Sequence, residues 1–382
     1  MANNRIELAD VIRQFMGPYR QHFGRQMLPS HRRALNDICR CMTPAMGGGR
    51  YQCRDCEETF WSYHGCRNRA CPKCHGRQIA IWLQKRTAEL LPCDYFHVVA
   101  TVPQELREFF LREQKLCYGI FMKSVAAALC ELARNRRYVG ATPGILAVLH
   151  TWTAQMRYHP HVHLLVTGGG VSEDGSTWHS AANRFLVPVR KLSLMIRQRF
   201  AHALQKERPS LFAQIPASVW RKEWCSFCKH FGSGSEAVLQ YLARYVFRIA
   251  INNNRILAMD QTHVTFRYKE KKTQTWKIER IPGVQFIRRF LLHVLPRGFH
   301  KVRYYGLWSA TNHKRQAALR IRLQVAEIQR AANEPIKVAD LAETALTRSG
   351  MESHACITKC PKCKSANVLL LERLPRGMNM VT

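Results

Sequence analysis

The densest group of cysteines lies in the segment CRCMTPAMGGGRYQCRDCEETFWSYHGCRNRACPKC, residues 39–74. Its short loops of Gly, Arg and Cys cannot bury enough apolar surface to fold by packing alone, so a metal ion must hold them. The paired thiols Cys53 with Cys56 and Cys71 with Cys74 have a spacing that predicts one tetrahedral, structural Zn²⁺ site with no open coordination position. The candidates for a second site are Cys39, Cys41, His64 and Cys66.

Basic residues surround the second cysteine pair, in CRNRACPKCHGR. Arg67 and Arg69 stand next to the thiols and are suited to contact phosphates, so we expect a zinc module that binds DNA. Near the C-terminus, Cys360 and Cys363 follow His354 and Cys356 and predict a further small zinc site. The alternative there is a disordered tail with incidental cysteines.

The charge of the chain favours a polyanionic partner. Its 382 residues include 59 Lys and Arg against 26 Asp and Glu, a net charge of +33. Nucleic acid is favoured over a membrane, since no apolar run approaches the roughly 18 residues of a spanning helix. The N-terminus MANNRIELAD has no apolar signal segment, so we expect a protein of the reducing cytoplasm, associated with the nucleoid, whose 15 cysteines bind metal.

Residue composition and pattern divide the chain into three parts. Residues 1–90 are expected to form an N-terminal zinc-binding domain that recognises DNA. In residues 91–310, strands such as CDYFHVVATVP, ILAVLHTW and HVHLLVTGGGVS alternate with long helical stretches, which predicts an α+β or α/β domain with a central sheet. Residues 311–382 are expected to be a basic, helical C-terminal region that carries the possible zinc knuckle.

Three histidines alternate along YHPHVHLLVTGGG, residues 158–170. Residues two apart in a strand share a face, so His159, His161 and His163 point the same way. The apolar residues beyond them predict a buried central strand, in which an imidazole needs a partner. His161 and His163 are suited to chelate one divalent ion, whereas Pro160 makes His159 the outlier. The alternative is a set of satisfied core histidines.

A third ligand would complete this site. If ILAVLHTW and the histidine strand form a hairpin through TAQMRY, His150 lies opposite the pair and completes a face of three nitrogens, leaving positions open for substrate oxygens. His97 and Gln155 are the alternatives for this third position.

The segment GSGSEAVLQYLARYVFRIAI, residues 232–251, predicts a helix that begins at the capping-box residues Ser233 and Glu236. Tyr241 and Tyr245 are four residues apart and lie together beside its apolar stripe. A phenol has an ordinary pKa of about 10, so attack at neutral pH requires help from nearby cations. Arg244, Arg248 and the divalent ion would supply that help. The alternative is a purely structural role, with both tyrosines at the edge of a core.

Together these motifs resemble the two-tyrosine HUH transposases of the IS91 family, which move insertion sequences by a rolling-circle route. The similar stretches are HPHVHLL, YLARY, CRNRACPKC, FHVVATVP and FIRRFLLHVLPRGFHKVRYYGL, and they cover nearly the whole chain. The resemblance implies an α+β fold, in which a small zinc-binding domain precedes a HUH endonuclease domain with a central antiparallel sheet flanked by helices. It also implies Mg²⁺ or Mn²⁺ at His161 and His163, and Tyr241 and Tyr245 as nucleophiles.

The sequence therefore predicts a bacterial transposase that cleaves and transfers single-stranded DNA through 5′-phosphotyrosine intermediates. Its expected partners are single-stranded DNA at the element ends and the target, with a host helicase as a candidate and no membrane. The link conserves the phosphodiester energy, in keeping with the lack of a G-x-x-x-x-G-K-[ST] motif. The rivals are a plasmid replication initiator or relaxase of the same chemistry, and a non-catalytic zinc-finger protein that binds nucleic acid.

Overall fold

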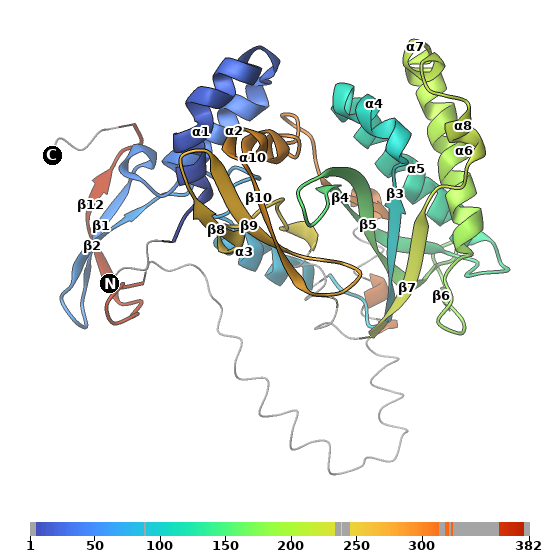
Figure 1. Ribbon diagram of the computed structural model, residues 1–382. Coiled ribbons are helices and arrows are strands. Elements are labelled where there is room, and N and C mark those ends of the chain that lie inside the picture. The colour runs from blue at the N-terminus through green and yellow to red at the C-terminus, as the bar shows by residue number, and fades with distance from the viewer. Residues whose placement is uncertain are drawn as a thin grey trace.

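The computed structural model describes residues 5–87, 89–233, 238, 245–312, 318–320, 322–323 and 359–377 (Figure 1). Its helices are α1 (Leu8–Phe23), α2 (Pro29–Arg40), α3 (Gly76–Thr87), α4 (Arg107–Arg112), α5 (Gln114–Arg134), α6 (Val189–Glu207), α7 (Pro209–Ala213), α8 (Ser218–Arg221) and α10 (Gly283–Leu291). Its strands are β1 (Gly48–Cys53), β2 (Thr59–Tyr63), β3 (Asp94–Thr101), β4 (Thr142–Trp152), β5 (Tyr158–Val171), β6 (Trp178–Ser180), β7 (Ser226–Ser233), β8 (Ile256–Met259), β9 (His263–Lys269), β10 (Trp276–Pro282), β11 (Val302–Gly306) and β12 (Val368–Leu374).

A six-stranded antiparallel sheet forms the centre of the larger part of the molecule. Its strands run in the order β11-β4-β5-β3-β7, and β6 pairs with the end of β5. Strands β4 and β5 are buried along almost their whole length, which explains their nearly continuous apolar sequence. The sequence predicted these strands and a mixed α and β architecture.

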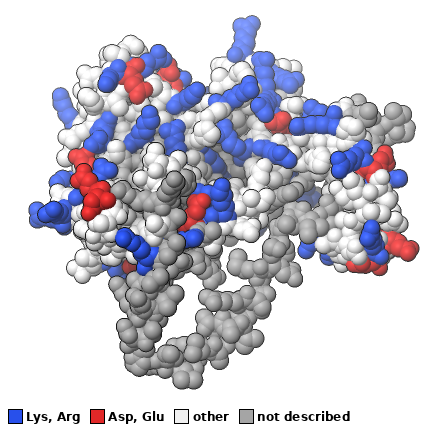
Figure 2. Space-filling model, turned by 180° about the vertical axis from the view of Figure 1, so that it is seen from behind, with Lys and Arg blue, Asp and Glu red and all other residues white. Residues whose placement is uncertain are grey.

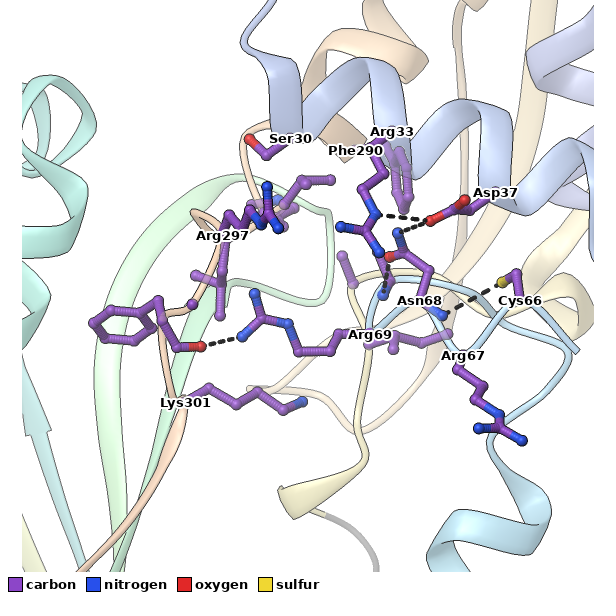
Figure 3. A pocket seen from close by; sticks show the side chains of 18 of the residues that line it. Ser30, Arg33, Asp37, Cys66, Arg67, Asn68, Arg69, Phe290, Arg297 and Lys301 are labelled. Atoms are coloured by element: carbon purple, nitrogen blue, oxygen red, sulfur yellow. Dashed lines mark hydrogen bonds and ion pairs between the residues drawn. The ribbon is translucent and has the colours of Figure 1, made fainter.

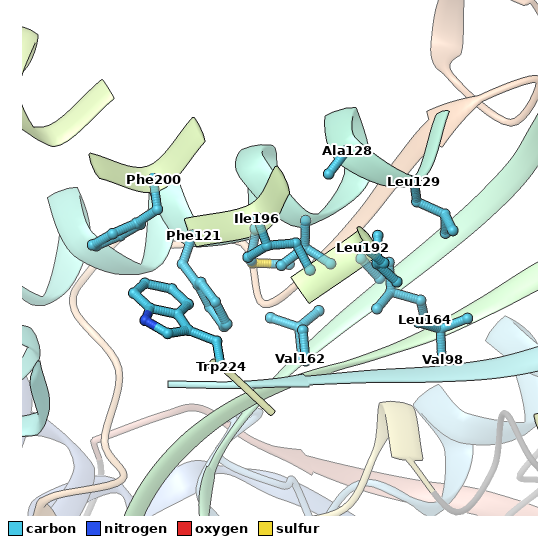
Figure 4. Close-up of a cluster of buried hydrophobic side chains, with 14 of the residues drawn as sticks. Val98, Phe121, Ala128, Leu129, Val162, Leu164, Leu192, Ile196, Phe200 and Trp224 are labelled. Atoms are coloured by element: carbon cyan, nitrogen blue, oxygen red, sulfur yellow. The ribbon is translucent and has the colours of Figure 1, made fainter. Parts of the chain in front are cut away.

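Helices α5 and α6 cover one face of this sheet. Phe121 of α5 and Phe200 of α6 belong to one apolar cluster with Val162 and Leu164 of β5 (Figure 4). Helix α5 is long and apolar enough to cross a membrane, but 72% of its most apolar stretch is buried inside the protein. Helix α5 is therefore apolar because it lies in the core of the protein. Side chains alternate along a strand, so Val162 and Leu164 point toward these helices and His161 and His163 point to the opposite face of the sheet.

A second core joins the N-terminal helices to a much later part of the chain. Phe15 of α1 and Leu35 of α2 share one apolar cluster with Phe266 of β9 and Phe286 of α10. Strands β8, β9 and β10 form their own three-stranded antiparallel sheet beside these helices. The predicted boundary near residue 90 thus does not separate two independently packed units, because α1 needs α10 to bury its apolar face.

The C-terminal segment also returns to the beginning of the chain. Strand β12 pairs antiparallel with β1 in the sheet β12-β1-β2, with Cys53 opposite Val368 (Figure 1). The predicted C-terminal region of residues 311–382 therefore ends inside the zinc-bearing N-terminal part. Most of the expected basic helix of that region lies outside the described residues.

The glycines after the histidines belong to strand β5. The chain stays extended to Val171. A Cβ on Gly168 would lie 2.7 Å from the carbonyl oxygen of Asp94, and one on Gly170 would lie 2.6 Å from the carbonyl oxygen of Thr142. Glycine is required here because neighbouring backbones approach closely, so these residues continue the strand and do not form a turn.

Replacing Gly283 by Ala tests the contact between α1 and α10. The new Cβ would lie 2.4 Å from Phe15 Cδ1, so overpacking should cost about 1–3 kcal/mol of unfolding free energy. Urea unfolding of the full chain measures this loss. Gly17→Ala is the control: nothing lies within 4 Å of its Cβ, and it should be neutral or raise stability by about 0.5–1 kcal/mol. Equal stability of the two variants would contradict the packing described for α10.

Candidate metal centres and the basic cavity

Three imidazoles converge on the sheet face opposite α5 and α6. The antiparallel register places His150 of β4 directly opposite His161 of β5, with His163 two residues further along the same face. One ring nitrogen from each of these histidines lies within 4.8 Å of the others, and this trio is here called the histidine cluster. The predicted hairpin and its cross-strand geometry are both present in the structure.

Hydrogen bonds to backbone carbonyls indicate which nitrogen remains free in two of the three rings. His161 Nδ1 donates to the carbonyl of His159 at 2.7 Å, which leaves Nε2 with a lone pair. His150 Nε2 donates to the carbonyl of Tyr245 at 2.6 Å, which leaves Nδ1. These bonds are of the kind that orient metal-binding histidines in proteins. The donor set fits a divalent ion held by three nitrogens with further positions open to oxygen ligands.

Burial keeps the imidazoles of the cluster neutral. It lowers the pKa of His161 to about 4 and also lowers the pKa values of His150 and His163 well below the ordinary range of histidine, with repulsion from neighbouring imidazoles adding to the effect. A neutral imidazole keeps its lone pair at physiological pH, as ligation of a metal requires.

The other histidine candidates have different positions. His97 Nε2 lies 3.0 Å from His163 Nδ1, so His97 sits behind the cluster and fixes the orientation of His163. His150, and not the alternative His97, completes the group of three converging imidazoles. His159 Nδ1 accepts a hydrogen bond from Arg107 at 2.7 Å and stays outside the cluster, as Pro160 suggested. The backbone carbonyl of Gln155, the other alternative, accepts a hydrogen bond from Arg289 Nη1 at 3.4 Å.

One of the two predicted nucleophiles lies against the histidine cluster. The ring centroid of Tyr245 is 4.2 Å from that of His163 and 5.3 Å from that of His97. Val246, next to it, is buried in the apolar cluster that covers this face of the sheet, together with Val238 and Leu165. Tyr241 and Arg244 fall outside the described residues.

The cysteines form two groups of four that differ from the predicted set. The knuckle site contains Cys41, Cys66, Cys71 and Cys74, and the ribbon site contains Cys53, Cys56, Cys360 and Cys363. The sulfurs of Cys53 and Cys363 are 3.5 Å apart and those of Cys66 and Cys74 are 3.7 Å apart. These separations approach the edge of about 3.8 Å expected for a ZnS₄ tetrahedron with Zn–S bonds of about 2.3 Å.

The grouping of Cys53 and Cys56 with Cys71 and Cys74 is therefore wrong, and so is the separate C-terminal site. Pairing of β12 with β1 brings Cys360 and Cys363 over the end of β1, about 300 residues away in sequence. No spacing rule for neighbouring cysteines could have found that partner. Cys66 belongs to a site as predicted, Cys41 joins it, and His64 and Cys39 belong to neither.

A basic cavity of about 500 Å³ lies between the knuckle site and the central sheet (Figure 3). Arg67, Arg69 and Arg248, which the sequence predicted to bind DNA, all line it. Sequence reasoning missed Arg297 and Lys301, which also point into it (Figure 3). Lys and Arg side chains also spread across the rear face of the molecule, where acidic side chains are few (Figure 2).

Comparisons with known proteins agree with this combination of zinc ligands and sheet. Residues 11–102 match the family described as "Transposase zinc-binding domain", and residues 144–317 match the family described as "Putative transposase". "Putative transposase y4qJ" of Sinorhizobium fredii is 34% identical over 97% of this chain and 96% of its own length. "Transposase for insertion sequence element IS801" of Pseudomonas savastanoi pv. phaseolicola is 26% identical over 70% of this chain and 67% of its own length.

No solved structure matches the chain. The combined matches define a zinc-binding transposase of an insertion sequence. The chain belongs to the IS91 family of transposases.

Cys363→Ser tests the division of the cysteines into two sites. Because this sulfur completes the ribbon site, the variant should lose one of two bound Zn²⁺ ions and keep the ion of the knuckle site. Elemental analysis of the purified protein measures zinc per chain. Cys225→Ser, which alters an exposed thiol outside both groups, should keep both ions. A Cys363→Ser protein with unchanged zinc content would contradict the assignment of Cys363 to the ribbon site.

His97→Phe tests the support of the histidine cluster. Loss of the nitrogen beside His163 should lower Mn²⁺ affinity about 10–100-fold, as expected for a residue that orients a ligand. Calorimetric titration with Mn²⁺ measures the change. His161→Ala should abolish binding, and His159→Phe should leave it unchanged. Equal losses for His97→Phe and His159→Phe would show that the effect is a general disturbance of the sheet.

Proposed function

We propose that this transposase cleaves single-stranded DNA and transfers the cut strand through tyrosine-linked intermediates, as HUH enzymes of rolling-circle elements do. The observation that carries the proposal is the convergence of His150, His161 and His163 under the ring of Tyr245. A zinc-finger protein without catalysis has no need for three desolvated imidazoles beside a phenol. The names of the two relatives favour transposition over plasmid replication.

The chain's own groups have distinct roles in the proposed reaction. Tyr245 Oη attacks phosphorus, the bond from phosphorus to the 3′-oxygen breaks, and the departing 3′-oxygen takes a proton. The phenol gives up its proton to solvent, and the strand remains joined to the enzyme by a 5′-phosphotyrosine bond. A Mg²⁺ or Mn²⁺ ion at His150, His161 and His163 would supply Lewis-acid stabilisation of the charge that develops on the phosphate.

A second nucleophile, Tyr241, would serve the other cleavage or the target strand. Arg248 follows Tyr245 by three residues and lines the basic cavity, which supports contact with the DNA backbone near the cut. Arg244 is proposed to contribute in the same way. We further propose single-stranded element ends and target DNA as partners, a host helicase as an accessory, and a cytoplasmic location at the nucleoid.

Removing the tyrosine hydroxyls tests the chemistry. Single-stranded oligonucleotides from the element ends, incubated with protein and Mn²⁺, should give a protein–DNA adduct that survives a denaturing gel. Tyr241→Phe and Tyr245→Phe should each block some step of strand transfer, and the double variant should form no adduct. Tyr138→Phe, which alters a tyrosine packed against Phe185, should behave as the unchanged protein. An adduct from the double variant would contradict the assignment of the nucleophiles.

Omitting the divalent ion from the adduct assay distinguishes the proposed function from a non-catalytic zinc-finger protein. The proposal requires Mn²⁺ or Mg²⁺ for the adduct, whereas a non-catalytic zinc-finger protein would bind DNA with a steep dependence on salt and never cut it. Cleavage of plasmid origin sequences in preference to element ends would instead identify a replication initiator or relaxase.

A further inference from the structure

The basic cavity combines the features of a nucleotide site. Its walls come from distant parts of the chain: α2, the knuckle site, the end of β4, the segment after Tyr245, and α10 with the loop between α10 and β11. Its cationic lining residues are Arg33, Arg67, Arg69, Arg248, Arg297 and Lys301. Its aromatic lining residues are Trp152, Phe290 and Phe299. A volume of about 500 Å³ lies within the usual range of ligand sites and admits a single nucleotide, although not a base pair with both backbones.

The positive charge of this cavity is poorly compensated within the protein. Asp37 is the one carboxylate among the described lining residues, and it is engaged by Arg33 at 3.5 Å and by Asn68 at 2.9 Å. Lys301 Nζ donates to the carbonyl of Arg248 at 3.4 Å and forms no ion pair among the described residues. Like charges gathered around one cavity raise the free energy of the unliganded protein, and a bound anion lowers that cost.

The pKa of Lys301 reports the same environment. Burial lowers it to about 8, and the nearby Arg69 lowers it in addition. Arg69 is itself held in place by hydrogen bonds to the carbonyls of Pro296 and Phe299. A phosphate beside Lys301 would favour the charged ammonium, so the geometry and the charge both indicate an anion at this position.

The cavity adjoins the histidine cluster directly. Trp152 lies two residues after His150 on β4, and the two rings stack with their centroids 4.7 Å apart. The carbonyl of Lys301 accepts a hydrogen bond from the backbone N–H of Leu149, the residue before His150. Because Trp152 lines the cavity and stacks on His150, a strand with one phosphate at the histidine cluster can place a neighbouring nucleotide in the cavity.

We propose that the basic cavity receives one extruded nucleotide of the single-stranded DNA, next to the phosphate held at the histidine cluster. Lys301 and Arg248 contact the phosphate of this nucleotide, and Trp152 contacts its base. Aromatic contact of this kind accepts any base, so the cavity fixes the position of the strand more than its sequence. This proposal rests on the proposed function, because it takes the histidine cluster as the place where DNA is cut.

The zinc knuckle gains a second role from this arrangement. Residues Cys66 to Ala70 form one wall of the cavity, and backbone N–H groups of Asn68 and Lys73 donate to the sulfurs of Cys66 and Cys71 at 3.4 Å. The ion thereby fixes the backbone that presents Arg67 and Arg69. Recognition of DNA by the knuckle and cleavage at the sheet then act on neighbouring nucleotides.

Binding of oligodeoxythymidylate of about 20 nucleotides to the full-length, zinc-loaded protein tests the proposal by fluorescence anisotropy. Lys301→Met should weaken binding about tenfold and reduce the slope of log affinity against log salt by about one phosphate contact. Trp152→Leu should weaken binding about tenfold without a change in slope. Lys191→Met removes an exposed lysine of α6, on the far side of the sheet, and should have no effect.

A fluorescent base analogue locates the extruded nucleotide. 2-Aminopurine, placed in turn at each position of a single-stranded oligonucleotide from the element end, where the cleavage site fixes the register, should be quenched by Trp152 at one position only, and Trp152→Leu should abolish that quenching. Unchanged affinity and salt slope for Lys301→Met, or quenching that survives Trp152→Leu, would overturn the proposal. Equal binding of single-stranded and duplex DNA would overturn it as well, because a duplex cannot enter the cavity.

The adduct assay distinguishes failure of the cavity proposal from failure of the cleavage proposal. If the unchanged protein forms the tyrosine adduct while the Lys301 and Trp152 variants bind oligonucleotide normally, the cavity proposal fails and the cleavage proposal stands. If the variants lose binding as expected but no protein forms an adduct with Mn²⁺, DNA uses the cavity and the cleavage proposal fails.

Discussion

The register between β4 and β5 is the constraint on which the candidate site depends. Side chains alternate between the two faces of a sheet, so a slip of one residue would send His161 and His163 into the apolar layer under α5 and α6. The long apolar faces of both strands make such a slip costly, because Val162 and Leu164 would then leave the core. The packing that stabilises the domain thus also fixes the three imidazoles opposite that core.

The two groups of four cysteines stabilise segments that have little apolar core of their own. The knuckle site orders a loop that has few apolar contacts of its own and turns its arginines toward the central sheet. The ribbon site ties β12 to β1 and so joins the C-terminal segment to the N-terminal part of the protein. A small three-stranded sheet with exposed leucines has little core, which explains why four thiols are needed to hold it.

Basic residues of the knuckle site and of segments next to the central sheet line the same cavity. An excess of Lys and Arg is spread over the whole sequence, yet the fold gathers part of it around one cavity beside the histidine cluster. Repulsion among these cations is a cost that the free protein bears, and a polyanion relieves it. The fold thereby places attraction for DNA next to the groups proposed to cut it.

The sequence by itself determined the local features of this protein. Alternation along residues 158–170 showed that His161 and His163 share a face, the apolar runs predicted the central strands, and the cysteine pairs predicted zinc, because each signal depends on residues a few positions apart. Tertiary structure alone decided which cysteines share an ion, that α1 packs on α10, and that Lys301 joins Arg69 in a cavity. These contacts join segments tens to hundreds of residues apart, and their partners are chosen by strand pairing and by burial of apolar surface across the whole chain, which no local spacing encodes.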